Sequence, residues 1–262
     1  MNLRKLFDLT GKHALVTGAG GAIGSAISQG FAEFGAHVAC LDISREIAAV
    51  AAQTVRESGD TEALPITCDV RDPQQIQHAV KEVLESFGKI DILVQAAGNG
   101  ILKPTTEFTL DDWEETIRVY LRSTFVFAKL VGGEMIKRGK GSIINISSVA
   151  STVALGRGTA AYGAAKAGVN GLTRELALEW AKDGVRVNAV APCQIDTPQL
   201  RKLLNDPQFD PDKLMGTWLD AIAMGRIGQP HEIAGPCIFL ASEASSLVTG
   251  HVLFVDGGYT IK

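Results

Sequence analysis

A glycine-rich turn between an apolar segment and a helical segment constrains the fold of this chain more than any other sequence feature. Residues 12–17 predict a short buried strand, residues 18–24 include four glycines, and residues 25–35 predict a helix that Gly35 ends. Glycine permits a positive φ and lets the backbone approach a ligand closely. A helix N-terminus offers free N–H groups and a partial positive charge to a pyrophosphate. A glycine-rich turn alone is often only a tight turn, but this strand–turn–helix context favours dinucleotide binding.

Strand-like and helix-like segments alternate along the whole chain without a linker, an internal repeat or a low-complexity stretch. The expected strands are residues 12–17, 37–41, 63–68, 90–95, 142–147, 185–191 and 251–255. The later helices are expected at residues 43–58, 73–87, 111–137, about 162–182 and 231–241. This alternation predicts an α/β fold, with a parallel seven-stranded sheet flanked by helices on both faces in a single doubly wound Rossmann-type domain over residues 1–262.

Ligands of such sheets bind beyond the carboxyl ends of the strands. The residues expected along that edge are Gly18, Asp42, Asp69, Gly98, Ser148 and Pro192. Residues 198–227 carry Pro207, Pro211 and Trp218, and they show no strand pattern. A segment of this length and low regularity predicts a flap that covers a substrate.

Composition excludes several classes of function. The formal net charge of the 262 residues is −4, which gives no basic footprint for nucleic acid and no polybasic patch for a membrane surface. No run reaches the ~18 apolar residues of a membrane span, and the first residues do not form a signal peptide, so we expect a cytoplasmic protein. The four cysteines are scattered and no ligand cluster is evident, which predicts reduced thiols and no metal site.

Asp42 follows the second expected strand, about 20 residues beyond the glycine turn. A carboxylate at this place accepts hydrogen bonds from the adenosine ribose and repels a 2′-phosphate, which favours NAD and makes NADP the less favoured cofactor. Arg45 lies three residues further on and is the one cation that argues for caution. An alternative interpretation makes Asp42 the N-cap of the following helix.

Tyr162 and Lys166 are four residues apart in an alanine-rich segment, so a helix places them on one face. A free tyrosine has a pKa near ~10 and is a poor base at neutral pH. A neighbouring cation favours the phenolate and lowers that pKa, which prepares the phenol for proton exchange with a substrate. The alternative interpretation is an ordinary surface pair.

Seven segments in this order resemble the short-chain dehydrogenases/reductases over nearly the whole chain. They are Thr17-Gly18 with Ala22-Ile23-Gly24, Asp69-Val70, Ala96-Ala97-Gly98, Ser147-Ser148, Tyr162 with Lys166, Pro192 with Thr197, and Val255-Asp256-Gly257-Gly258. The resemblance implies that Tyr162 is the general acid/base, that Lys166 holds the nicotinamide ribose and tunes Tyr162, and that Ser148 bonds the substrate oxygen.

The same resemblance implies a set of cofactor-binding residues. Gly18, Ile23 and Gly24 are expected to cradle the pyrophosphate, Asp69 and Val70 to flank the adenine, and Ile195 and Thr197 to meet the carboxamide. The full expected set is Gly18, Gly21, Ile23, Gly24, Asp42, Asp69, Val70, Ala97, Gly98, Tyr162, Lys166, Pro192, Ile195 and Thr197.

The sequence departs from the family pattern in four places. Ala22 replaces a glycine of the turn, which is tolerable if its φ is negative. Gln95 and Ala96 stand where the family has asparagine, and Cys193 stands where it has glycine, as a reactive thiol or, preferably, an apolar filler. Tyr120 stands where the resemblance places a catalytic asparagine that holds a relay water. It either takes over the relay, blocks it, or marks a different route for the proton.

The leading hypothesis is an NAD-dependent dehydrogenase that interconverts a secondary alcohol and a ketone on a polyol, sugar or sugar acid. Arg157, Gln194 and Arg201 are candidates to meet polar groups of such a substrate. The alternatives are a ketoreductase of an acyl or cyclic ketone, and a cofactor-binding scaffold or sensor impaired by Tyr120. The resemblance also implies a homotetramer.

Overall fold

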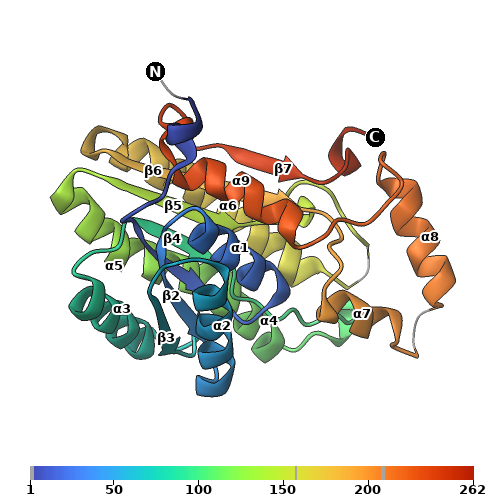
Figure 1. The fold of residues 1–262 in the computed structure, drawn as a ribbon. Coiled ribbons are helices and arrows are strands. Elements are labelled where there is room, and N and C mark those ends of the chain that lie inside the picture. The colour runs from blue at the N-terminus through green and yellow to red at the C-terminus, as the bar shows by residue number, and fades with distance from the viewer. Residues whose placement is uncertain (1–2, 157, 208–209) are drawn as a thin grey trace.

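The computed structural model describes residues 3–156, 158–207 and 210–262, and a parallel β-sheet runs through its centre (Figure 1). The sheet has seven strands in the described residues, in the order β3-β2-β1-β4-β5-β6-β7, and all of its strand pairs are parallel. The strands are β1 (His13–Thr17), β2 (His37–Asp42), β3 (Ala63–Thr67), β4 (Ile92–Gln95), β5 (Gly141–Ile146), β6 (Val185–Pro192) and β7 (Val252–Val255). The predicted fold class is confirmed.

The strand order reverses beside β1. The chain moves outward from β1 to β2 and β3, and then returns to pair β4 with the other side of β1. A doubly wound sheet opens its ligand crevice at this switch point, beyond the carboxyl ends of the strands. The glycine turn after β1 and residues 96–98 after β4 lie against each other at this point, where the Ala96 and Ala97 N–H groups donate to the Thr17 hydroxyl.

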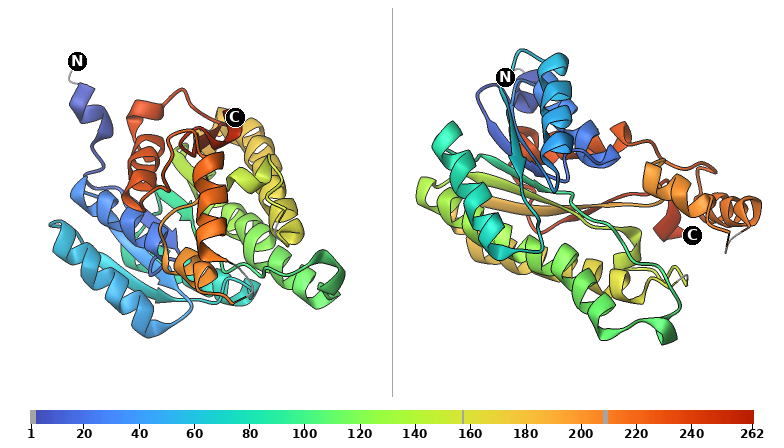
Figure 2. Two further views of the ribbon diagram at one scale, coloured as in Figure 1. Left: turned by 90° about the vertical axis from the view of Figure 1, so that its right-hand side faces the viewer. Right: turned by 90° about the horizontal axis from the view of Figure 1, so that it is seen from below.

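Two layers of helices bury the two faces of the sheet, as Figure 2 shows. The apolar cluster on one face includes residues of α1 (Ala22–Glu33), α2 (Arg45–Ser58) and α9 (His231–Ala241). The cluster on the other face includes residues of α3 (Pro73–Phe87), α5 (Ser123–Arg138) and α6 (Ala160–Trp180). Val16 of β1 enters the first cluster and its neighbour Leu15 the second, because successive strand side chains point to opposite faces.

One predicted helix is interrupted. The sequence predicts a single helix over residues 111–137, but the structure has α4 (Leu110–Ile117), a π-helical turn at Arg118–Arg122, and then α5. The Ser123 and Thr124 hydroxyls donate to carbonyl oxygens four residues back, at 2.5 and 2.6 Å, and such bonds distort a helix. No proline or glycine marks this interruption in the sequence, and π-helical turns are frequent at functional sites.

The expected irregular character of residues 198–227 is wrong. Two helices lie there, α7 (Pro198–Leu204) and α8 (Pro211–Ala221), and both project past the carboxyl edge of the sheet (Figure 1). Each begins with a proline in its first turn, after an N-cap side chain from Thr197 or Asp210. Proline is favoured at the first position of a helix, so these prolines start helices rather than break them.

Asp91 joins three elements at the amino edge of the sheet. Its carboxylate accepts hydrogen bonds from the His13 backbone at 3.0 Å and from Arg138 at 2.9 Å, and it lies 3.2 Å from the Lys89 ammonium. The starts of β1 and β4 are thereby tied to the end of α5.

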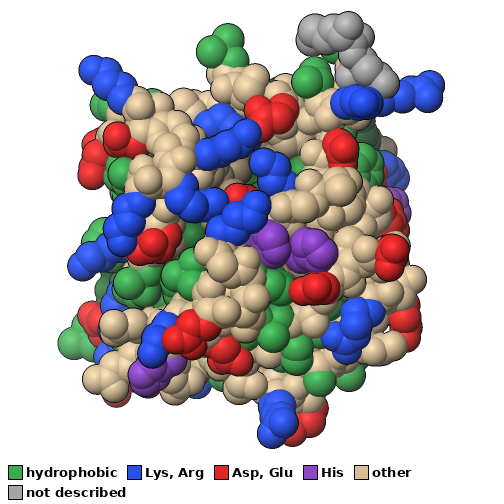
Figure 3. All heavy atoms as spheres, turned by 60° about the vertical axis from the view of Figure 1, so that its left-hand side comes forward, with side chains coloured by type: hydrophobic (Ala, Val, Ile, Leu, Met, Phe, Trp, Pro, Cys, Tyr) green, Lys and Arg blue, Asp and Glu red, His purple; other side chains and the backbone are tan. Residues whose placement is uncertain are grey.

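On the face shown in Figure 3, Lys and Arg side chains are interspersed with Asp and Glu around neighbouring histidines.

We predict that Asp91→Asn lowers the free energy of unfolding by about 2 kcal/mol at pH 7, as expected for lost hydrogen bonds to a charged group. Burial by itself raises the pKa of Asp91, but the bonds from Arg138 and His13 outweigh burial and lower it. The stabilisation is therefore present above pH 3.8 and is lost as the pH falls through the folded pKa. Urea unfolding at pH 7 and pH 3 checks this, with exposed Asp60→Asn as control; an equal loss at both pH values would contradict it.

Candidate active site

A cavity of about 600 Å³ lies at the carboxyl edge of the sheet, over the switch point. Most of the predicted site residues line it: Gly18, Gly21, Ile23, Gly24, Gly98, Ser148, Tyr162, Lys166, Pro192, Ile195 and Thr197. Four others, Asp42, Asp69, Val70 and Ala97, do not line it. α7 and α8 contribute four apolar side chains to its lining, Leu200, Leu203, Leu214 and Trp218.

The glycine turn is packed so closely that side chains are excluded. Gly18 has φ +66°, and a Cβ added there would lie 2.7 Å from the Ala97 Cα. A Cβ on Gly24 would lie 2.1 Å from the Gly18 carbonyl oxygen. Ala22 is the first residue of α1, and no described non-glycine residue has a positive φ, so the condition set for this departure from the family pattern is met.

The N-terminus of α1 lacks a side-chain cap. Its N-cap is Gly21, which makes no side-chain hydrogen bond, whereas Ser44, Asp72 and Thr109 cap α2, α3 and α4. The first-turn N–H groups of α1 therefore face the cavity edge without a side chain to satisfy them. An uncapped, glycine-lined helix start fits a pyrophosphate.

Asp42 lies at the end of β2 beside this turn. Its carboxylate accepts from the Gly20 backbone at 3.0 Å and from the Ile43 backbone at 2.8 Å. The alternative interpretation of Asp42 as the N-cap of α2 is wrong, because the Ser44 hydroxyl accepts from the Ile47 backbone and caps that helix.

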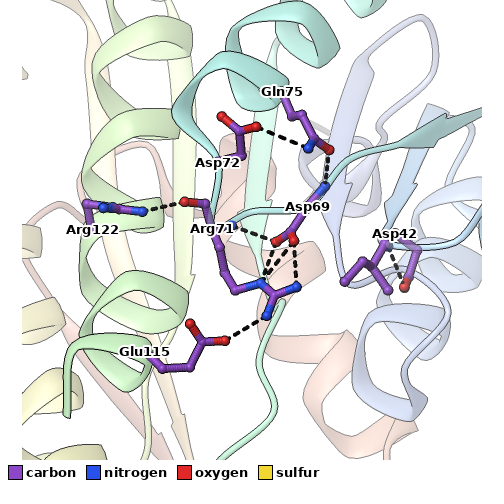
Figure 4. Close-up of polar contacts among 8 residues, drawn as sticks. Asp42, Asp69, Arg71, Asp72, Gln75, Glu115 and Arg122 are labelled. Atoms are coloured by element: carbon purple, nitrogen blue, oxygen red, sulfur yellow. Dashed lines mark hydrogen bonds and ion pairs between the residues drawn. The ribbon is translucent and has the colours of Figure 1, made fainter. Parts of the chain in front are cut away.

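Asp69, at the end of β3, is held by an arginine that sequence reasoning missed. Arg71 binds both Asp69 carboxylate oxygens at 2.6–2.9 Å and also contacts Glu115 of α4 at 2.8 Å, and Arg122 donates to the Arg71 carbonyl (Figure 4). The hydrogen bonds from Arg71 keep the pKa of Asp69 below its usual value. The Asp69 carboxylate is thus paired with a side chain of the same protein.

Lys166 of α6 is buried, and its ammonium donates a hydrogen bond to the Ile146 carbonyl at the end of β5, at 2.6 Å. Burial lowers the pKa of Lys166 to about 7. The ammonium nitrogen also lies 4.6 Å from the Tyr120 ring centroid and 5.7 Å from the Tyr162 ring centroid. The structure therefore brings Tyr162 and Lys166 together in a cavity, and the surface-pair interpretation is wrong.

The expected direction of the Tyr162 pKa needs correction. The sequence predicts that Lys166 lowers it, but burial raises the pKa of Tyr162 and outweighs a hydrogen bond with Ser148. Lys166 is buried as well, and burial lowers its pKa, so the lysine carries a positive charge less readily than an exposed lysine does.

A hydrogen-bonded chain fixes the Ser148 loop to α6. Ser147 donates to the Asn170 side-chain oxygen, the Asn170 amide donates to Ser151, and Ser151 donates to the Ser148 carbonyl, over 2.5–2.7 Å. Sequence reasoning missed Asn170. Its signal was the spacing of four residues from Lys166, which repeats the Tyr162–Lys166 spacing on the same helix face.

The residues expected to meet a polar substrate divide into three cases. Gln194 lines the cavity. Arg201 does not, and it binds Asp196 at 2.7 and 2.8 Å with an exposed side chain, so that expectation is wrong. Arg157 lies outside the described residues. Cys193 lines the cavity, and burial raises the pKa of its thiol to about 11, which favours an apolar filler over a reactive thiolate.

Comparisons with known proteins identify the family of this chain. The family described as Enoyl-(Acyl carrier protein) reductase matches residues 18–260. A D-threitol dehydrogenase of Mycolicibacterium smegmatis is 42% identical, over 98% of this chain and 95% of that protein. A crystal structure of a short-chain type dehydrogenase/reductase from Mycobacterium marinum is 32% identical and covers 100% of both chains with a TM-score of 0.93. This chain belongs to the short-chain dehydrogenase/reductase family.

A further similar structure contains a nicotinamide cofactor, NADP. A gluconate 5-dehydrogenase from Burkholderia cenocepacia J2315, solved in complex with NADP and tartrate, is 38% identical and covers 100% of both chains with a TM-score of 0.92. Membership of the short-chain dehydrogenases/reductases makes this chain an NAD(P)-dependent oxidoreductase, and it leaves the choice between NAD and NADP open.

Two negative findings apply to the part of the chain that the structure describes. It contains no group of three or more His, Cys, Asp or Glu side chains that could hold a metal ion. None of its helices combines the length and the apolar character needed to cross a bilayer.

The buried ammonium predicts a pH-dependent stability. The pKa of Lys166 is about 7 when folded and 10.5 ordinarily, so lowering the pH from about 10 to 7 protonates the unfolded chain first and destabilises the fold. Lys166→Met cannot ionise. We expect the free energy of unfolding of the variant, relative to that of the wild type, to rise by more than about 1 kcal/mol as the pH falls from 9.5 to 7. Denaturant unfolding at both pH values checks this, with exposed Lys182→Met as control; a constant difference would contradict it.

Proposed function

We propose that this chain is an NAD-dependent dehydrogenase that interconverts a secondary alcohol and a ketone on a polyol, sugar or sugar acid. The observation that carries the proposal is the convergence of Ser148, Tyr162 and Lys166 on one cavity that begins at an uncapped, glycine-lined helix N-terminus. The D-threitol dehydrogenase and the gluconate 5-dehydrogenase among the similar proteins support this substrate class.

In the proposed mechanism the nicotinamide cofactor supplies the hydride acceptor when it is bound. Tyr162 takes the proton of the substrate hydroxyl during oxidation and returns it during reduction. Ser148 donates a hydrogen bond to the same substrate oxygen and stabilises its developing charge. Lys166 supplies a positive charge close to the phenol, held in place by the Ile146 carbonyl. The proposed cofactor-binding set is the one expected from the sequence.

We also propose a single catalytic domain over residues 1–262 in which α7 and α8 form the substrate flap, and a cytoplasmic homotetramer as the assembly. Large apolar side chains are exposed on α4, α5 and α6, among them Leu110, Phe125 and Leu178. Such side chains on neighbouring helices favour contact with another copy. Light scattering of the purified protein tests the tetramer.

Two alternatives have specific support. The matching family description favours a reductase of acyl substrates, and the tyrosine at position 120 favours a binding scaffold that does not turn over. A substrate screen separates them. Oxidation of threitol, galactitol or gluconate with NAD supports the proposal, reduction of acyl or cyclic ketones with no polyol oxidation supports the ketoreductase, and cofactor binding without turnover supports the scaffold.

We predict that Tyr162→Phe lowers kcat by at least about 1,000-fold while changing the NAD dissociation constant less than about threefold, because only the acid/base hydroxyl is lost. Steady-state kinetics and fluorescence titration with NADH check both parts. Tyr259→Phe, at the C-terminus, is the matched control. Activity within tenfold of the wild type would reject Tyr162 as the base.

We predict that Asp42→Ala raises kcat/KM with NADP relative to NAD by about tenfold or more, because the Asp42 carboxylate repels the 2′-phosphate of NADP. Hydrogen bonds from the Gly20 and Ile43 backbones hold this carboxylate in position. Glu57→Ala, on α2 away from the turn, is the control. An unchanged NADP/NAD ratio would show that Asp42 does not select the cofactor.

A further inference from the structure

Tyr120 lies in the distorted part of the helix, and its side chain lines the cavity. It is the central residue of the π-helical turn Arg118–Arg122, it is 6% exposed, and it lines the cavity. Its ring covers Gly98, because a Cβ on Gly98 would lie only 2.2 Å from the Tyr120 ring carbon Cε1. The absence of a side chain at Gly98 is therefore what makes room for the Tyr120 ring.

The ring contacts both partners of the proposed acid/base pair. The Lys166 ammonium lies over the Tyr120 ring at 4.6 Å from the centroid, within the range of a cation–π contact. The Tyr120 and Tyr162 rings meet edge to face, with centroids 5.1 Å apart and planes at 78°. The ammonium thus lies between the Ile146 carbonyl oxygen and an aromatic face.

A buried polar network fixes this turn against the sheet. Gln95 of β4 donates to the Thr124 carbonyl at 3.2 Å and to the Asn145 side chain at 2.9 Å. Asn145 in turn donates to Thr173 of α6 at 2.9 Å. The Thr124 hydroxyl donates to the Tyr120 carbonyl, so the Tyr120 backbone is anchored to the same helix that carries Tyr162 and Lys166.

We propose that Tyr120 is a positioning residue whose aromatic ring, rather than its hydroxyl, holds the Lys166 ammonium and the Tyr162 ring in their working arrangement. The proposal rests on the catalytic roles proposed above for Tyr162 and Lys166. Burial raises the pKa of Tyr120, so its side chain meets Lys166 and Tyr162 as a neutral phenol. The ring face acts on Lys166 through charge, which favours the protonated lysine.

The test compares Tyr120→Phe, which keeps the ring, with Tyr120→Leu, which removes it. We expect Tyr120→Phe to retain kcat within about threefold, and Tyr120→Leu to lose at least about tenfold. We also expect the alkaline limb of the kcat/KM profile to move down by up to about one pH unit in Tyr120→Leu, because the unsupported ammonium loses its proton earlier. Exposed Phe34→Leu, at the end of α1, is the matched control.

A second readout does not depend on turnover. The side-chain carbon resonance of Lys166, followed by NMR against pH, should titrate at a lower pH in Tyr120→Leu and at the wild-type pH in Tyr120→Phe. If Tyr120→Leu unfolds, Tyr120→Met replaces it, because a flexible thioether fills the space without a π face.

Each outcome has one meaning. Equal losses in Tyr120→Phe and Tyr120→Leu would assign the role to the hydroxyl and overturn the proposal. An unchanged rate and Lys166 titration in Tyr120→Leu would overturn it as well. If the wild type oxidises no alcohol and reduces no ketone, the proposed function fails, and the NMR titration still decides whether the ring holds the ammonium.

Discussion

The buried ammonium of Lys166 places the strongest single demand on this structure. A charged group removed from water destabilises a fold unless other groups in the protein compensate for its lost hydration. Besides the Tyr162 ring on the same helix, the ammonium meets the Ile146 carbonyl oxygen at the end of β5 and, at a shorter distance, the face of Tyr120. Both lie on elements other than α6, so the position of the ammonium fixes how the sheet edge, α6 and the turn before α5 meet.

This arrangement explains why two departures from the family pattern occur together. Tyr120 is larger than an asparagine, and its ring needs the space above Gly98. Gln95 has a side chain long enough to reach both the Thr124 carbonyl and Asn145. The Tyr120 ring forms part of the cavity wall. Gln95 holds the Thr124 backbone next to the turn that carries Tyr120, so both residues act on the same turn.

The sequence predicted the sheet almost strand by strand because its strands are nearly continuous apolar runs closed by small or acidic residues. Apart from Thr17 and Gln95 at their carboxyl ends, the buried residues of β1 and β4 are apolar, and such runs have few other stable locations. The resemblance to the family implied Ser148, Tyr162 and Lys166 as a group, and all three line one cavity in the structure.

Features that depend on burial or on local hydrogen bonds were not predictable in the same way. The π-helical turn keeps helical periodicity on both sides, and the hydroxyls that distort it occupy ordinary helix positions. The raised pKa of Tyr162 follows from burial, which residue spacing does not reveal. The ion pair of Asp69 with Arg71 was not predicted, because the sequence does not distinguish a strand-end carboxylate that binds a ligand from one that pairs with a neighbouring side chain.

The two ends of the cavity are built from different parts of the protein chain. At the glycine turn the wall is backbone, and a Cβ at Gly18 or Gly24 has no room, so the shape of this end tolerates little change. Elsewhere the wall includes side chains of α7 and α8, among them Leu214 and Trp218. A motif therefore records the backbone geometry at the glycine turn, whereas no motif describes the side chains that α7 and α8 contribute to the cavity.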